Sequence, residues 1–169
     1  MKIEPFELSI STAVGVFTAR YSEKGLTRLN FPAAEPACGT DRTPQRGDPA
    51  IPAKIHRSHR VTAAALKKIL AGGSPGKLPP LDPAGTEFQR RVWNALRKIP
   101  VGKTKSYGEI ARAIGRPRAV RAVGGACGAN PIPVLVPCHR VLAANGRIGG
   151  FSSGLDWKRE LLAREGIKI

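Results

Sequence analysis

The sequence predicts an α+β fold in which a small sheet-and-helix domain precedes a mainly helical domain. Three segments with the β-branched and aromatic character of strands lie within residues 6–31, whereas helical spacing and helix-capping patterns dominate from Thr86 onward. Stretches rich in proline and glycine interrupt the chain between these regions. A chain of 169 residues can hold one small domain and one somewhat larger domain, and we place them at residues 1–80 and 81–169.

The first domain opens with three short segments, FELSIST, GVFTAR and GLTRLNF, which are separated by turn-like residues. A three-stranded meander is the simplest arrangement for such segments. Residues 32–53 hold five prolines and two glycines, which indicates a surface loop, so no role is expected for Cys38 within it. Residues 55–71 follow as a helix, in which isoleucines and leucines are spaced among alanines and basic residues.

The second domain opens with helices whose first turns carry capping signals. Thr86 and Gln89 form one capping box, and Ser106 and Glu109 form another. A third helix over 119–130 follows the tight turn RPR. The second and third helices, joined by this brief turn, are a candidate helix-turn-helix.

After Asn130 the run PIPVLV is expected to be extended, because Pro131 and Pro133 both exclude a helix. The cluster PCHRV at 137–141 follows at once. A glycine- and serine-rich loop, AANGRIGGFSSG, then leads into a last helix that ends at Gly166. A thiol and an imidazole therefore stand next to each other at the end of an apolar run.

The net charge of +16 is concentrated in the second half of the chain. Residues 86–169 hold sixteen Lys and Arg against five acids, whereas residues 1–85 hold twelve against seven. Such a surplus is the electrostatic footprint of a protein that binds a polyanion. It favours nucleic acid as the partner over a membrane surface or no partner. No run of eighteen apolar residues predicts a membrane span.

The N-terminal segment MKIEPFELSI has acids and no apolar core, so no signal peptide is expected. Three cysteines are an odd number without paired spacing, which favours a reducing compartment. We expect the cytoplasm, at the nucleoid in a prokaryote, or the nucleus in a eukaryote. His56 and His59 lie beside the loop with irregular spacing and there is no CxxC pair, so neither a metal nor a cofactor is expected.

The third helix is unusually rich in small residues, including Gly124, Gly125, Ala126 and Gly128. Glycine weakens a helix, so these positions indicate that something approaches the helix closely. Two explanations for the small residues remain open: DNA approaches an exposed face of the helix, or a neighbouring helix packs tightly against it inside the protein.

Cys138 is the candidate nucleophile, because a thiol needs a neighbouring base or positive charge to become a thiolate and His139 follows it directly. In an extended backbone the two side chains would point to opposite faces, so a turn or one bridging water is required. Glu165 is the candidate carboxylate to orient the histidine, because it lies at a helix end where the helix dipole disfavours an acid. A buried cysteine with a purely structural role is the alternative.

These motifs resemble one family closely, the O6-alkylguanine-DNA alkyltransferases. The resemblance covers roughly residues 86–166 and includes FQRRVW, IPVGKTKSYGEIA, RAVGGACGANPIPVLVPCHRV and GGFSSGLDWKRELLAREG; residues 1–75 resemble the family only weakly. It implies that a small RNase H-like α/β domain precedes a DNA-binding and alkyl-acceptor domain. It also implies a monomer that acts on double-stranded DNA bearing O6-alkylguanine, with O4-alkylthymine left open as a second substrate.

The resemblance assigns roles to the motif residues. It implies that Cys138 accepts the alkyl group by in-line displacement and keeps it as a thioether. It implies that His139 draws off the thiol proton through a water and that Glu165 holds His139. Asn130 is implied to brace the turn as a buried hinge residue, and Tyr107 to donate toward guanine N3 and to help rotate the nucleotide's phosphate.

On the DNA side, the resemblance implies that Arg121 enters the duplex through the minor groove and fills the gap left by the flipped base. The other implied DNA contacts are Ser106, Tyr107, Arg118, Ala119, Gly124 and Ala126. The implied guanine pocket consists of Pro133, Val141, Phe151, Ser152 and Ser153, in which the carbonyls of Cys138 and Val141 read the N2 amino group and Ser152 donates to O6. Phe151 departs from the pattern, because several relatives have tyrosine there, and a hydroxyl contact beside the pocket is lost.

The expected function is repair of alkylated DNA by one stoichiometric transfer per molecule, after the damaged base has been flipped out of the duplex. Three other classes of protein are weighed against it. A non-catalytic protein that binds alkylated lesions would replace the acceptor cysteine. A cysteine–histidine hydrolase would not need the helix-turn-helix or the positive charge, and a transcription regulator would carry an additional regulatory domain.

Overall fold

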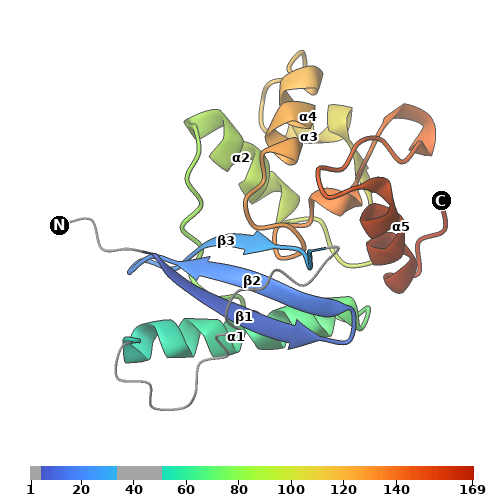
Figure 1. Ribbon diagram of the computed structural model, residues 1–169. Helices are drawn as coiled ribbons and strands as arrows, with labels where there is room; N and C mark the ends of the chain where they lie inside the picture. Colours follow the sequence, from blue (N-terminus) through green and yellow to red (C-terminus); the bar gives the residue numbers. More distant parts are fainter. Residues whose placement is uncertain (1–4, 34–50) are drawn as a thin grey trace.

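The computed structural model describes residues 5–33 and 51–169, so Cys38 and most of the predicted Pro-rich loop lie outside the described residues. An antiparallel sheet opens the chain, with the strand order β1 (Phe6–Thr12), β2 (Gly15–Tyr21) and β3 (Leu26–Asn30). Helix α1 (Ala53–Leu70) lies along the sheet (Figure 1). The predicted meander and the helix that follows it are confirmed.

The strands alternate between buried and outward-facing side chains, as a half-buried sheet requires. Leu8 and Ile10 of β1 are buried, as are Phe17, Ala19 and Tyr21 of β2. Helix α1 contributes an apolar stripe at helical spacing to the same core, made of Ile55, Ala65, Leu66, Ile69 and Leu70.

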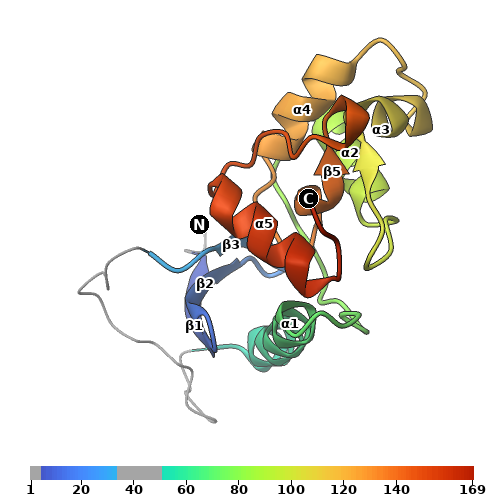
Figure 2. The ribbon, with the colours of Figure 1, turned by 90° about the vertical axis from the view of Figure 1, so that its right-hand side faces the viewer.

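Among the described residues, four further helices follow: α2 (Glu87–Leu96), α3 (Tyr107–Ala113), α4 (Val120–Gly128) and α5 (Leu155–Arg164). Both predicted capping boxes are present, Thr86 with Gln89 on α2 and Ser106 with Glu109 on α3. Helices α3 and α4 lie at one end of the molecule and α1 lies at the other, in both views (Figures 1 and 2). None of the helices in the described parts has the length and apolar character needed to cross a membrane.

A short parallel pairing ties the start of α3 to the PCHRV segment. Strand β4 (Lys105–Ser106) pairs with β5 (Val141–Leu142), and a 3₁₀ turn, η1 (Cys138–Arg140), comes directly before β5. Because Tyr107 follows β4 directly, this pairing places the first turn of α3 beside the cysteine segment, although the two are far apart in the sequence.

The run PIPVLV is not extended, so that prediction was wrong. Val134 takes a left-handed backbone conformation with φ of 72°, and the N–H of Val136 donates to the carbonyl of Ile132 at 2.9 Å, which closes a tight turn. The two prolines of the run offer no N–H to a strand ladder. The side chain of Asn130 satisfies the turn instead: its Oδ1 accepts from Ile132 N at 3.0 Å and its Nδ2 donates to Val136 O at 2.8 Å.

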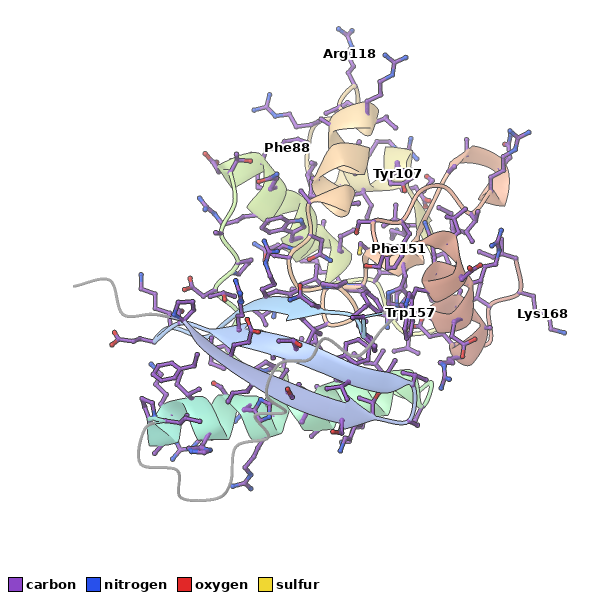
Figure 3. The ribbon with its side chains drawn as sticks, viewed as in Figure 1. Phe88, Tyr107, Arg118, Phe151, Trp157 and Lys168 are labelled. Atoms are coloured by element: carbon purple, nitrogen blue, oxygen red, sulfur yellow. The ribbon has the colours of Figure 1, made fainter. Side chains whose placement is uncertain are left out.

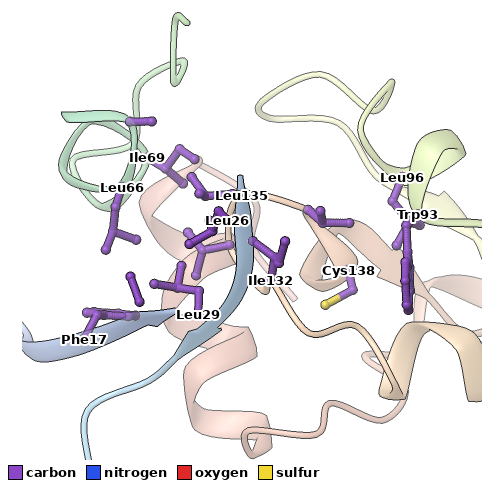
Figure 4. Packing of buried hydrophobic residues seen from close by; sticks show 14 of the residues in the cluster. Phe17, Leu26, Leu29, Leu66, Ile69, Trp93, Leu96, Ile132, Leu135 and Cys138 are labelled. Atoms are coloured by element: carbon purple, nitrogen blue, oxygen red, sulfur yellow. The ribbon is translucent and has the colours of Figure 1, made fainter. Parts of the chain in front are cut away.

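One continuous hydrophobic core joins the two halves of the chain (Figure 4). Leu29 of β3 is buried in it, and the Leu29 N–H donates to the carbonyl of Pro131 at 2.9 Å. An aromatic cluster extends this contact, since the ring centroid of Phe31 lies 4.7 Å from that of Trp157 and 6.0 Å from that of Phe151. The N-terminal sheet therefore supports the loop that carries Phe151.

Candidate active site

The η1 turn places Cys138 in the wall of a pocket of about 160 Å³. Cys138 itself is only 4% exposed. The pocket is bounded by the start of α3, one face of α4 and the loop before α5, through Tyr107, Gly124, Cys127, Gly128, Gly150, Phe151 and Ser152. A buried thiol thus faces a small, partly open pocket rather than bulk solvent.

Asn130 links the tight turn to the thiol. Its Nδ2 donates to the carbonyl of Val136 and also lies 3.2 Å from Cys138 Sγ. The N–H of Cys138 donates to the same carbonyl at 2.8 Å. One buried amide therefore fixes the backbone that carries the cysteine and contacts its sulfur.

Burial raises the pKa of the Cys138 thiol, because a thiolate is poorly solvated in this position. The hydrogen bond from Asn130 and the positive charge of Lys158 act in the opposite direction. Since the net direction is upward, the thiol is protonated at rest, and its use as a nucleophile requires a base.

His139 is fully buried, and its Nε2 lies 2.9 Å from Glu165 Oε1. Desolvation lowers the pKa of His139 and outweighs the opposite effect of Glu165. The imidazole is therefore neutral, and its Nε2–H donates to the carboxylate, which leaves the lone pair on Nδ1. Nδ1 is buried and makes no hydrogen bond with any residue that the structure describes, so it is the free proton acceptor of the ring.

Glu165 holds three segments of the chain together. Its side chain is 1% exposed, and its carboxylate accepts from Arg140 Nη2 at 2.8 Å and Nε at 2.9 Å and from the N–H of Gly102 at 3.1 Å. Burial alone would raise the pKa of Glu165, but the hydrogen bonds from His139, Arg140 and Gly102 outweigh it and lower the pKa to about 2. Glu165 is therefore ionised, and its ion-pair partner is Arg140, because His139 is neutral.

Tyr107 closes one side of the pocket. Its hydroxyl donates to the carbonyl of Gly150 at 3.5 Å, and burial raises the pKa of its phenol, which keeps it protonated. Gly149 has a φ of 66°, and a Cβ at this position would lie 3.2 Å from the Tyr107 hydroxyl. Glycine therefore allows the loop to cross the tyrosine ring at close range.

Comparison with known proteins shows which family has this sequence and fold. Residues 87–167 match the family model described as 6-O-methylguanine DNA methyltransferase, DNA binding domain. A methylated-DNA–protein-cysteine methyltransferase of Methanosarcina barkeri is 41% identical to the chain over 160 residues, which cover 92% of this chain and 94% of that protein. The chain belongs to the methylated-DNA–protein-cysteine methyltransferase family.

Two further comparisons agree with membership of this family. A methylated-DNA–protein-cysteine methyltransferase of Methanosarcina acetivorans is 60% identical over 107 residues, which cover 63% of this chain and 69% of that protein. The crystal structure of Mycobacterium tuberculosis OGT in complex with DNA has a TM-score of 0.70 and 38% sequence identity to this chain, and the match covers 94% of this chain and 91% of that one. The predicted α+β class is therefore confirmed.

In this family member, the residues predicted to contact DNA lie around α3 and α4. Arg118 and Arg121 are exposed, and Arg118 projects away from the body of the molecule in Figure 3. Ser106 is the N-cap of α3 and Ala119 is the N-cap of α4. Arg118 and Arg121 are thus exposed near the N-terminal end of α4, where they can contact a partner.

The small residues of α4 have different surroundings. Gly124 lines the Cys138 pocket, and a Cβ added at Gly125 or Gly128 would meet no atom within 4 Å. Helix packing inside the protein therefore does not require glycine at Gly125 or Gly128. Ala126 differs, because it is 3% exposed and its carbonyl accepts from Trp93 Nε1 at 2.8 Å, which places it in the core.

The predicted guanine pocket is divided between two cavities. Phe151 and Ser152 line the Cys138 pocket, whereas Pro133 and Ser153 line an adjoining cavity of about 320 Å³ that also includes Ser152. Val141 is not among the residues that line either cavity: it is fully buried, and its carbonyl accepts from Lys158 Nζ at 2.7 Å. The structure thus brings the cysteine, histidine, glutamate and asparagine together and spreads the pocket residues around them.

Lys158 of α5 is a site residue that the sequence did not indicate. It is fully buried, and its Nζ donates to the carbonyl of Val141 at 2.7 Å and to that of Gly150 at 3.1 Å. These bonds tie α5 to the cysteine segment and to the loop above the pocket. The ammonium charge also opposes the effect of burial on the pKa of Cys138.

A signal for Lys158 was present in the spacing. It precedes Leu161 by three residues and Leu162 by four, and such residues share one face of a helix. Both leucines are buried, so the lysine lies on the buried face. Arg140 was equally unexpected as a partner of Glu165, because arginine side chains are mostly exposed and the sequence gives no sign that this one is buried.

Proposed function

We propose that this protein repairs alkylated DNA by transferring the alkyl group from O6-alkylguanine in duplex DNA to Cys138. The names of its relatives, which are methylated-DNA–protein-cysteine methyltransferases, support alkyl transfer from DNA to a cysteine. The observation that carries the proposal is the site itself: a buried thiol faces a small, partly open pocket, and the next residue is a neutral histidine held by Glu165. Residues 81–169 form the DNA-binding and alkyl-acceptor domain, and residues 1–80 form the RNase H-like domain that supports it.

The reaction is an in-line displacement at the alkyl carbon. His139 Nδ1 takes the Cys138 proton through one water, and Glu165 stabilises the charge that develops on the imidazole. The thiolate forms a bond to the alkyl carbon, the bond from that carbon to guanine O6 breaks, and its electron pair leaves with the guanine. Tyr107 donates toward guanine N3 and so stabilises the departing base.

The remaining site residues hold the reactants in place. Asn130 acts as the hinge residue that fixes the cysteine turn, and the charge of Lys158 stabilises the thiolate as it forms. The carbonyls of Cys138 and Val141 accept from the guanine N2 amino group, and Ser152 donates to O6. Phe151 packs against the base without supplying a hydroxyl.

The substrate carbon lies inside the base stack of a duplex, so the damaged nucleotide must be flipped out. Helices α3 and α4 act as the helix-turn-helix that docks on DNA, and the exposed Arg121 fills the gap that the base leaves. Flipping costs a few kcal/mol, which phosphate contacts from the basic surface offset. Ser106, Arg118, Ala119 and Gly124 lie at this docking surface.

Each molecule reacts once, because no group in the site can cleave a thioether. The protein acts as a monomer without a cofactor. Because its substrate is chromosomal DNA, it acts at the nucleoid in the cytoplasm if the source is a prokaryote, or in the nucleus if it is a eukaryote.

Intact-protein mass spectrometry tests this function directly. The protein is incubated with a duplex that carries one O6-methylguanine and is then mapped by peptide analysis. We expect one added methyl group per chain, on the peptide that contains Cys138. An unchanged mass with retained lesion binding would overturn the proposal and leave a protein that only recognises the lesion.

Substituting Arg121→Ala is expected to slow repair in duplex DNA much more than reaction with free O6-benzylguanine, because only the duplex requires base flipping. Single-turnover rates on both substrates measure the difference. Lys24→Ala, which removes an exposed charge from the turn between β2 and β3, is the control and should change neither rate. Equal slowing of Arg121→Ala on the two substrates would exclude the proposed role.

A further inference from the structure

Helix α1 carries an exposed row of positive charge that the proposed repair site does not use. Lys54, Arg57 and Arg60 follow one another at a spacing of three residues, and all three are exposed. Lys67 and Lys68 are exposed in the last turn, and the helix contains no Asp or Glu. None of these five side chains forms an ion pair with a residue that the structure describes.

Other helices offset their exposed bases with acids. Arg91 pairs with Glu87 in α2 at 2.8 Å, Arg164 pairs with Glu160 in α5 at 2.7 Å, and α3 contains Glu109. Among the described helices, α4 is the other one without an acid. Helix α1 therefore shares the absence of acids with the helix that we place against DNA, which carries one basic residue, Arg121.

The stability of α1 does not explain this pattern. Like charges three residues apart on a helix repel each other, and a cation near the N-terminus, such as Lys54, opposes the helix dipole. Lys67 and Lys68 are different, because the dipole favours cations in the last turn. A bound polyanion would turn the repulsion within the row of Lys54, Arg57 and Arg60 into a favourable interaction.

The position of α1 leaves room for a second segment of duplex DNA. Helix α1 lies at the end of the molecule opposite α4 in both views (Figures 1 and 2), and its buried face packs into the core, so the row points to solvent. The three residues span about 9 Å along the helix axis, and a duplex presents a charge about every 1.7 Å of its own axis. A duplex seated on α4 leaves this row free for a separate segment.

We propose that Lys54, Arg57 and Arg60 form a second DNA-binding surface, which holds the phosphate backbone of another duplex segment while α4 engages the first. This inference rests on the proposed function, which supplies the first duplex. Contacts from lysine and arginine to phosphates carry no sequence information. The protein can therefore hold two segments of DNA, of which only the one at α4 reaches Cys138.

The test compares the full chain with the triple variant K54Q/R57Q/R60Q. The matched control is K24Q/K77Q/K168Q, which removes the same charge from three exposed positions outside the row of Lys54, Arg57 and Arg60. Native mass spectrometry and sedimentation measure how many short duplexes one protein molecule binds. Methyl transfer from an O6-methylguanine duplex is measured on the same samples.

We expect the wild type and the control to bind two duplexes at low salt and the triple variant to bind one. The affinity for the second duplex should fall at least about tenfold, and the slope of log K against log salt for that step should decrease by up to about three units, one for each lost phosphate contact. Methyl transfer should be unchanged in the variant. The proteins should not bind vesicles of anionic phospholipid through this row.

The outcomes separate the inference from the function on which it rests. If the wild type transfers the methyl group but binds only one duplex, or if the variant binds two, the second surface does not exist. If the row binds anionic vesicles in place of a second duplex, the partner is a membrane surface and the inference is overturned. If no methyl transfer occurs in any sample, the proposed function fails instead.

Discussion

Substituting Cys138→Ser is expected to abolish methyl transfer while leaving DNA binding intact. The hydroxyl of serine holds its proton far more strongly than a thiol does and is a weaker nucleophile toward an alkyl carbon, and the lowered pKa of His139 makes this histidine a weaker base. Removing the nucleophile of an enzyme costs rate on the order of 10⁶-fold, so no transfer should be detectable. Single-turnover mass spectrometry measures transfer, and fluorescence anisotropy with a lesion duplex measures binding.

The matched control is Cys127→Ser, which changes the other thiol that lines the same pocket. Burial raises the pKa of both thiols, that of Cys127 to about 12, so the two differ in the base beside them: His139 follows Cys138 directly. We expect Cys127→Ser to transfer the methyl group at a rate within a few-fold of the wild type. Methyl transfer that survives in Cys138→Ser but disappears in Cys127→Ser would move the acceptor role to Cys127.

Substituting Glu165→Gln is expected to lower the free energy of unfolding by about 3–5 kcal/mol, the usual cost of removing one partner from a buried ion pair. The reason is Arg140, which is 5% exposed and would keep its charge with only a neutral amide beside it. Transfer should also slow, because the imidazolium that forms on His139 would lose its carboxylate. Urea unfolding at neutral pH measures the first effect, and the pH dependence of Cys138 alkylation measures the second.

The stability difference should depend on pH in a defined direction. The pKa of Glu165 is about 2 in the folded protein against an ordinary value of 4.5. A lowered folded-state pKa gives stability that is complete above the unfolded-state value and is lost as the pH falls through the folded-state value. The difference in the free energy of unfolding between the wild type and Glu165→Gln should therefore shrink as the pH falls from about 4.5 to about 2.

Glu160→Gln serves as the control for this experiment. Glu160 lies five residues earlier on α5 and pairs with Arg164 at a side-chain exposure of 50%. An exposed pair of this kind contributes at most about 1 kcal/mol, so the variant should unfold almost as the wild type does. If Glu165→Gln and Glu160→Gln were equally stable, the buried ion pair with Arg140 would not support the fold.

Local sequence patterns predicted much of the fold, because the interactions that form these elements are short-range. The capping boxes at Thr86 and Ser106 each involve residues only three positions apart, and the alternation in β1 and β2 follows from the geometry of a strand. The run PIPVLV shows the limit of such patterns. Its prolines correctly excluded a helix, but the choice between a strand and a tight turn depended on the Asn130 side chain.

The sequence by itself determined the chemistry that this protein can offer: a thiol beside an imidazole, an acid at the end of the last helix and a strong excess of positive charge. Only the tertiary structure decided the state of these groups. Burial makes His139 neutral and raises the pKa of Cys138, and the fold brings Gly102, Arg140 and His139 to one carboxylate. Lys158 shows the physical reason most directly, because its ammonium group donates to the backbone carbonyls of Val141 and Gly150. Every residue has a backbone carbonyl, so the sequence does not mark these two as partners, and only the fold brings them to the lysine.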